Sequence, residues 1–180
     1  RVEDWLDSYA TERKAHVIEL TSRIKKVGEV ICERDLGKAR ARDAKLLAEC
    51  GGVVPDTPRQ DVMPHLQAGL LSSLAVNGRG MLFPQPRLRD GGLLMDDVLG
   101  HGWRWVTDGE WQLTELPPDW TVCDLTNQAQ EQEGVVLGWL RQHGAHAALV
   151  RPDHRVFGVA AHLAQAQHLR DEWLSWMCRP

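Results

Sequence analysis

The chain has 180 residues, of which 43% are hydrophobic and 26% are charged, and its formal net charge is −4 at pH 7. This composition is typical of a globular protein with one core, or with one core and an appendage. The acidic balance gives no electrostatic reason to expect nucleic acid or an anionic membrane as a partner. No apolar run reaches the ~18 residues that a membrane-spanning helix needs.

The first 50 residues are predicted to be helical. The chain begins at Arg1 without a methionine or a signal peptide, as if partway into a helix, which indicates a piece of a longer protein. Apolar residues then recur at helical spacing as far as Ile31, and a charged face lies opposite. The apolar stripe, which needs a partner, consists of Val17, Leu20, Ile24, Val27 and Ile31; the charged face consists of Glu12, Arg13, Lys14, Arg23, Lys25 and Lys26. A second helix is expected over about 38–49, ended by Gly51 and Gly52.

Residues 51–79 are predicted to be an irregular connection. Pro55, Pro58, Pro64, Gly69 and Gly78 interrupt every periodic pattern in this stretch. A short helix is expected around 66–74. This connection is the expected boundary between the helical segment and a C-terminal domain.

Residues 80–180 are predicted to form an α/β domain with a mixed sheet. The pattern indicates an edge strand around 81–88, helical turns over 93–99, and strands over 102–106 and 120–125. A helix over 135–142, two strands over 146–151 and 155–159, and a final helix over about 161–177 follow. Apolar residues of the last helix form one stripe, which consists of Leu163, Ala166, Leu169, Trp173 and Trp176.

Motifs for phosphate, metal and redox chemistry are absent from the sequence. The segments 77–80 and 100–102 each offer two glycines but no third glycine and no strand–turn–helix context, so we interpret them as loops. His143, His146, His162 and His168 lack metal-ligand spacing. The four cysteines, Cys32, Cys50, Cys123 and Cys178, fit neither a redox pair nor a zinc site; we interpret them as reduced thiols of a cytoplasmic protein, with a Cys32–Cys50 disulfide as an unsupported alternative.

Two further features have a functional and a structural interpretation. The eight tryptophans include Trp103 and Trp105 on one strand face and Trp173 and Trp176 on one helix face. An aromatic ligand pocket is possible, but a core and a subunit interface are favoured. The segment from Arg151 to His154 brings Arg, Asp and His together, yet Pro-Asp chemistry between two strands predicts a hairpin turn that points these side chains outward.

Several segments resemble flavin-dependent aromatic hydroxylases of the 3-(3-hydroxyphenyl)propionate hydroxylase type. Residues 6–16 match Leu-x-Ser-Tyr-x-x-Glu-Arg-x-x-His, the helix that closes the FAD-binding region of that family. Residues 150–153, Val-Arg-Pro-Asp, resemble the final hairpin of its C-terminal domain. Residues 64–70, 78–86 and 94–106 resemble the parts between, in the same order. Two departures are His154, where the family commonly has glycine, and a short segment 107–118, which leaves the helix there in doubt.

The resemblance implies the C-terminal part of such an enzyme: residues 1–50 as a helical segment continuing from an FAD-binding catalytic body, 51–79 as a connection, and 80–180 as a thioredoxin-like domain. The parent would use FAD and NAD(P)H to hydroxylate a phenolic ring. This part would serve stability and subunit contacts, with the protein's own N-terminal FAD-binding domain as partner and a homodimer as a further possibility. No catalytic, cofactor-binding or metal residue is assigned to it. The alternative is a redox-silent thioredoxin-like module for protein interaction or dimerisation.

Overall fold

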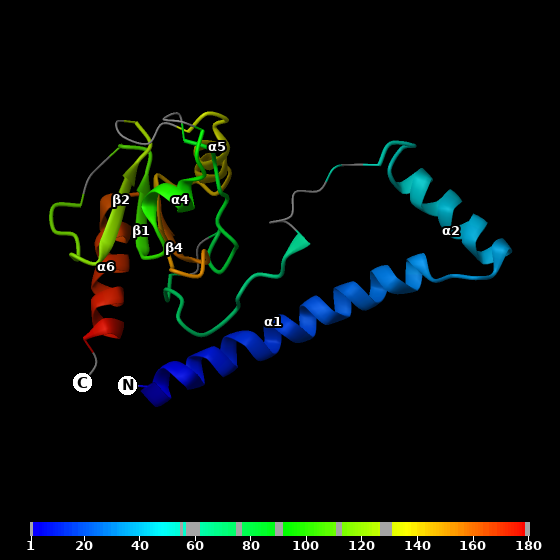
Figure 1. Ribbon diagram of the computed structural model, residues 1–180, viewed down its shortest axis with the longest axis horizontal. Helices are drawn as coiled ribbons and strands as arrows, with labels where there is room; N and C mark the ends of the chain where they lie inside the picture. The colour runs from blue at the N-terminus through cyan, green and yellow to red at the C-terminus, as the bar shows by residue number, and fades with distance from the viewer. Residues whose placement is uncertain are drawn as a thin grey trace.

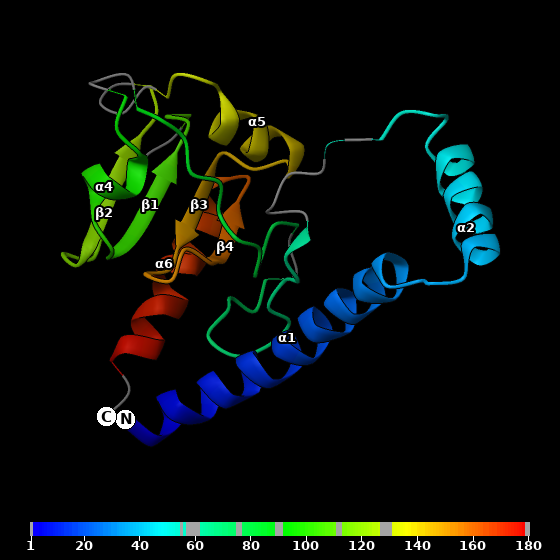
Figure 2. The same cartoon turned by 45° about the vertical axis from the view of Figure 1, so that its right-hand side comes forward.

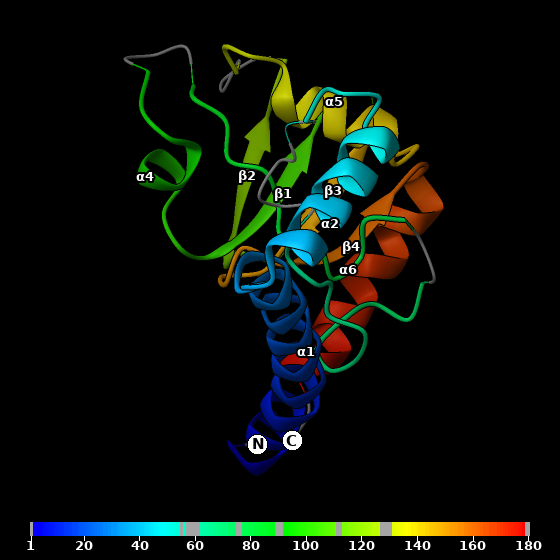
Figure 3. The same cartoon turned by 90° about the vertical axis from the view of Figure 1, so that its right-hand side faces the viewer.

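The computed structural model describes residues 2–54, 56, 62–74, 77–88, 92–110, 113–126 and 131–178, with side chains from residue 6 onward. A long helix runs beneath an α/β unit, and a second helix stands apart from that unit in two views (Figures 1 and 2). The N-terminal end of the long helix and the C-terminal end of the last helix lie close together (Figure 3). No helix in the described part is both long and apolar enough to cross a membrane.

Two helices form the N-terminal arm, as predicted. Helix α1 spans Val2–Ile31 and helix α2 spans Leu36–Glu49. Asp35 begins α2 because its carboxylate accepts a hydrogen bond from the Lys38 amide at 2.8 Å. Gly51 and Gly52 end it with positive φ angles of 60° and 83°. None of the residues of α2 is buried.

The α/β unit contains one mixed sheet of four strands in the order β2-β1-β3-β4. Strand β1 (Trp103–Thr107) runs parallel to β2 (Trp120–Asp124) and antiparallel to β3 (Ala147–Val150), and β3 forms an antiparallel hairpin with β4 (Val156–Ala160). Helix α4 (Met95–Leu99) precedes the sheet, α5 (Val135–Gln142) lies between β2 and β3, and α6 (Leu163–Met177) follows β4. The predicted α/β class with a preceding helical segment is confirmed.

Each face of the sheet has its own core. Met95 of α4 and Val136, Trp139 and Leu140 of α5 cover one face. Ala166, Leu169 and Trp173 of α6 cover the other, together with an aromatic cluster formed by Trp103, Trp105, Trp120 and Phe157. Trp105 and Trp120 stack at 5.8 Å between ring centroids, and the side chains of both are buried. The interpretation of these tryptophans as core residues is confirmed.

Two local predictions differ from the structure, and one open question is answered by it. Residues 66–74 contain no helix, because backbone amides there bond to other segments, such as Ser72 to the Phe157 carbonyl at 2.9 Å. The edge strand over 81–88 is reduced to isolated bridges, one of them between Leu82 and Arg155, because Pro84 and Pro86 interrupt it. The described part of 107–118 contains no helix, which answers the question that its short length raised.

Candidate functional site

The turn between β3 and β4 carries two buried arginines, Arg151 and Arg155. It begins at Arg151, whose amide donates to the Arg155 carbonyl at 2.8 Å. Both arginine side chains are buried, at 8% and 6% exposure, on a protein whose other arginines lie mostly at the surface. A buried cation requires paired acceptors, so the question is what lies against these two guanidinium groups.

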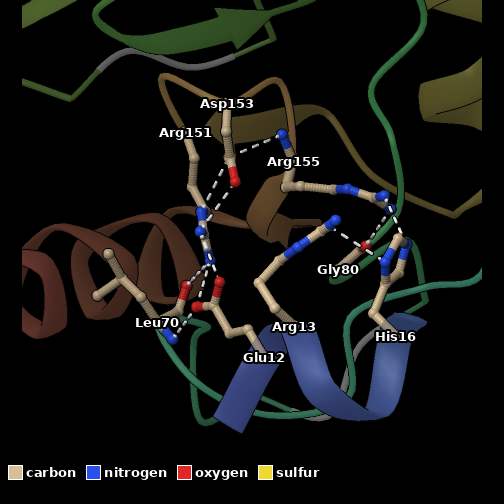
Figure 4. Close-up of polar contacts among 8 residues, drawn as sticks. All are labelled: Glu12, Arg13, His16, Leu70, Gly80, Arg151, Asp153 and Arg155. Carbon is tan, nitrogen blue, oxygen red and sulfur yellow. Dashed lines mark hydrogen bonds and ion pairs between the residues drawn. The ribbon is translucent and has the colours of Figure 1, made fainter. Parts of the chain in front are cut away.

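Arg151 uses all five of its N–H donors. It forms a two-pronged ion pair with Glu12 of α1, with N–O distances of 2.8 and 2.9 Å (Figure 4). Asp153 accepts two more bonds at 3.0 Å, and the Leu70 carbonyl accepts the last at 2.8 Å. Burial alone would lower the pKa of Arg151, but the bonds and charges of Glu12 and Asp153 outweigh it and raise that pKa. The guanidinium is therefore fixed as a cation with no donor left for a ligand.

The carboxylate of Glu12 is held from a second side. Its Oε1 accepts the Leu70 amide at 2.6 Å, so the loop around residue 70 closes over α1. Gly69 allows this approach: its φ is +97°, and a Cβ there would lie 2.0 Å from Cγ of Glu12. Glu12 belongs to the charged face of α1 that the sequence indicates, yet this residue is only 5% exposed and is paired.

Arg155 makes the second half of the contact with α1. Its Nη1 donates to the carbonyl of Pro64 at 3.0 Å. The same Nη1 donates to the carbonyl of Gly80 at 3.3 Å, and its Nη2 lies 2.9 Å from Nε2 of His16 (Figure 4). The other ring nitrogen of His16 lies 3.1 Å from Nη1 of Arg13. Burial and then the charges of Arg155 and Arg13 lower the pKa of His16, so the imidazole is neutral.

A neutral imidazole between two guanidinium groups can accept from only one of them, since guanidinium groups only donate. Protonation would remove that acceptor and add a third positive charge. The contact of His16 with Arg155 therefore depends on the neutral ring. We call the set formed by Glu12, His16, Arg151, Asp153 and Arg155 the α1 junction.

A second polar cluster lies on the other side of the same turn. Arg104 of β1 is fully buried and pairs with Asp96 of α4. His154 lies 2.7 Å from Arg104 Nη2 and 3.1 Å from Asp96 Oδ2 through its Nδ1. Its φ is +63°, in the left-handed region that glycine adopts without strain. The positive φ is the reason that glycine suits this position; His154 adopts the strained backbone and accepts a hydrogen bond from Arg104.

The Arg, Asp and His of the turn therefore do not converge on one reaction centre. Arg151 and Asp153 pair with each other and with α1, whereas His154 turns toward α4. The expectation that the turn points all three outward is wrong for Arg151, because the buried Glu12 draws its side chain inward. The hairpin itself is confirmed.

A serine–histidine–glutamate grouping in a separate pocket has the residue types of a hydrolase but not the geometry. Ser73 Oγ lies 3.3 Å from His168 Nε2, and Glu172 Oε2 lies 3.7 Å from that same nitrogen. A catalytic acid must hold the opposite ring nitrogen. Glu172 is instead bonded to Ser72 Oγ and the Ser73 amide, at 2.6 and 2.7 Å. This arrangement fastens α6 to the connection.

Neither glycine pair fits a dinucleotide. Gly100 follows the end of α4 and leads into a strand, which is the reverse of a strand-to-helix phosphate loop. Gly80 lies in a turn so tight that a Cβ would be 2.1 Å from the Leu66 carbonyl oxygen. Among the described residues, no group of three or more His, Cys, Asp or Glu side chains could hold a metal ion. Cys123 is buried, and burial raises its pKa to about 12, so it is not a nucleophile.

Sequence reasoning identified the segments of the α1 junction but not their contacts. The matched helix motif contains Glu12, Arg13 and His16, and the matched hairpin motif contains Arg151 and Asp153. A usable signal was the four-residue spacing of Glu12 and His16, which places both on one helix face. Nothing in the sequence pairs that face with a turn 139 residues away.

Comparison with known proteins gives one informative relative. A probable NADH-specific resorcinol 4-hydroxylase of Rhodococcus jostii (strain RHA1) is 31% identical over 186 aligned positions, which cover 93% of this chain and 34% of the relative. The chain therefore spans about a third of that relative's length. No protein-family model matches the chain. No solved structure matches it.

Proposed function

We propose that this chain is the C-terminal part of an FAD- and NADH-dependent monooxygenase that hydroxylates a phenolic ring in the cytoplasm, and that it contributes stability and contacts rather than chemistry. The observation that carries the proposal is the α1 junction. Segments that resemble the flavin hydroxylases in sequence, around residues 12, 66, 80 and 151, meet there in one hydrogen-bonded network. The resorcinol hydroxylase supports the choice of aromatic substrate and of NADH.

The proposal places the flavin and the nicotinamide outside this chain. The chain's glycine pairs do not fit a dinucleotide, and every donor of the buried Arg151 has a protein acceptor. When bound, the flavin would supply the oxygen chemistry. The residues described here would hold α1 at a fixed angle to the sheet.

We further propose a thioredoxin-like assignment for the sheet. Its support is the strand order β2-β1-β3-β4 with a parallel first pair, a C-terminal hairpin and a closing helix. The described residues between β1 and β2 contain neither a helix nor a Cys-x-x-Cys pair, so no redox activity is proposed.

The proposed partner of α1 is the FAD-binding domain of the same protein. Ile24, Val27 and Ile31 are 62%, 57% and 74% exposed, and α2 has no buried residue. Aliphatic side chains in such a continuous stripe are normally covered in the working protein. The rest of the parent is an occupant of suitable size, because the relative is about three times as long as this chain.

The test compares the 180-residue chain with its parent. The chain should purify without stoichiometric flavin and should not oxidise NADH in the presence of resorcinol. The paired change Ile24→Ser with Val27→Ser should leave the chain folded but lower the flavin content or solubility of the parent. Flavin bound to the isolated chain at one equivalent would contradict the proposal.

The second candidate is an interaction or dimerisation module. The same exposed stripe of α1 favours it. Analytical ultracentrifugation of the chain separates the two proposals: a stable dimer that Ile24→Ser dissociates supports the module, and a monomer at high concentration argues against it.

A further inference from the structure

A pocket of about 550 Å³ lies between the connection and the C-terminal end of α5, apart from the α1 junction. Most of the side chains that line the pocket are polar, and none of them is an aspartate or a glutamate. The polar side chains that line it are His65, Gln67, Asn77, Arg79, Gln142 and His143. Amide, imidazole and guanidinium groups all supply N–H donors, so the pocket is built to receive acceptors.

The electrostatic surroundings of the pocket are cationic. Burial lowers the pKa of His65 first, and the charges of Arg155 and Arg23 lower it further, while Glu19 opposes them. Arg79 supplies a full positive charge in the lining itself. Its Nη1 donates to the Ser72 carbonyl at 2.6 Å, which fixes the guanidinium at the border of this pocket and the neighbouring one around His168.

His143 is fixed before any ligand arrives. Its ring stacks on Trp139 with centroids 4.2 Å apart, and its Nδ1 bonds to the Trp139 carbonyl at 2.8 Å. Gly78, with φ of +94°, presses against both rings, and a Cβ there would lie 2.9 Å from Trp139 and 3.1 Å from His143. Nδ1 donates to that carbonyl, so Nε2 is the ring nitrogen that a ligand can meet, and it donates to an oxyanion when the ring is protonated. Packing against Trp139 holds it in position.

We propose that this pocket binds a small oxyanion, either a phosphate or a carboxylate group, through Arg79 and the imidazoles of His65 and His143. Arg79 forms charge-assisted bonds to the oxyanion. The amides of Gln67, Asn77 and Gln142 satisfy its remaining lone pairs. Arg79 also lines the neighbouring pocket around His168, but Asp171 and Glu172 line that pocket too, and their negative charges oppose the same ligand there.

The test is a titration of the 180-residue chain with inorganic phosphate and, separately, with sodium acetate, at constant ionic strength near pH 7. The histidine side-chain NMR signals report binding at each ring. His65 and His143 should shift together and saturably, and the pKa of His65 should rise in the bound state because an anion favours the imidazolium. His168 serves as the internal reference and should not follow the same curve. Saturation with phosphate alone, or with acetate alone, identifies which group the pocket takes.

Three variants sharpen the result. Arg79→Gln should weaken binding about tenfold, the cost of losing a charge-assisted contact. Arg141→Gln is the matched control, because it removes the same charge from the exposed face of α5, outside the pocket lining, and should leave binding unchanged. His143→Gln tests the pocket if Arg79→Gln disturbs the loop at Ser72, and it should weaken the phosphate response of His65.

Three outcomes would overturn the proposal. The first is the absence of a saturable shift at either histidine with either anion. The second is an equal response at His168, which would mean non-specific ion binding. The third is equal weakening by Arg141→Gln and Arg79→Gln, which would assign the effect to net charge rather than to the pocket.

Discussion

The α/β unit and the N-terminal arm are built on opposite principles. The sheet carries apolar cores on both faces, and strand residues such as Val106, Ala148 and Phe157 are fully buried. Helix α1 exposes its apolar stripe and is attached through Glu12 and His16 instead. The comparison teaches that hydrophobic burial makes one region stable by itself, whereas the other is positioned by a small number of charged contacts.

The largest expected effect lies in the core behind the sheet. Leu169→Ala on α6 removes a fully buried side chain and should lower the free energy of unfolding by about 3 kcal/mol. Leu174→Ala on the same helix removes a side chain that is 38% exposed and should cost less than about 1 kcal/mol. Chemical denaturation followed by tryptophan fluorescence measures both. Equal losses would mean that α6 does not pack as described.

The second effect should be confined to the arm. Glu12→Gln removes the buried carboxylate partner of Arg151 and leaves it only the more exposed Asp153, and breaking a buried pair typically costs about 3 kcal/mol. Amide hydrogen exchange in α1 should accelerate by at least about tenfold, while exchange in β1 and β3 stays unchanged. Glu29→Gln, at an exposed position of the same helix, is the control and should change neither. Accelerated exchange throughout the sheet would show that the two regions are not separable.

A third effect follows from the pKa of His16, which the folded state lowers below its ordinary value of 6.5. The detached state takes up the proton more readily, so the attachment of α1 is at full strength above pH 6.5. It weakens as the pH falls below 6.5 toward the lowered pKa. Hydrogen exchange in α1 should therefore rise between pH 7.5 and 5.5 after correction for intrinsic rates. His16→Gln should flatten this dependence, and an unchanged slope in that variant would assign the effect to other groups.

The smallest effect is expected at the apolar stripe. Ile24→Ser and Val27→Ser should change the stability of the isolated chain by no more than ~0.5 kcal/mol, because both side chains already face water. Thermal unfolding measures this. A loss comparable to that of Leu169→Ala would show that the stripe is covered in the isolated chain, and the contrast between the two regions would fail.

Periodicity predicted most of the α/β unit and both helices of the arm. Apolar residues alternate around Trp103 and form a stripe through Leu169 because these elements pack on a core. Both patterns are local, so they can be read from the sequence. The connection was less predictable. Gly69 and Gly80 are needed where the backbone passes close to other segments, and such contacts leave no periodic pattern in the sequence. The α1 junction was the least predictable. A charged residue such as Glu12 is predicted to be exposed to solvent unless its buried ion-pair partner is known. That partner, Arg151, lies near the other end of the chain.

The most direct test of the account is a double-mutant cycle on Glu12 and Arg151, with the attachment of α1 measured by hydrogen exchange. The variants are Glu12→Gln, Arg151→Gln and the combination of both. If the buried ion pair positions the arm, the two changes should be coupled by about 2 kcal/mol, and the double variant should lose little more than either single one. Changes that add to within about 0.5 kcal/mol would contradict the account, because the helix would then be held by something other than this pair.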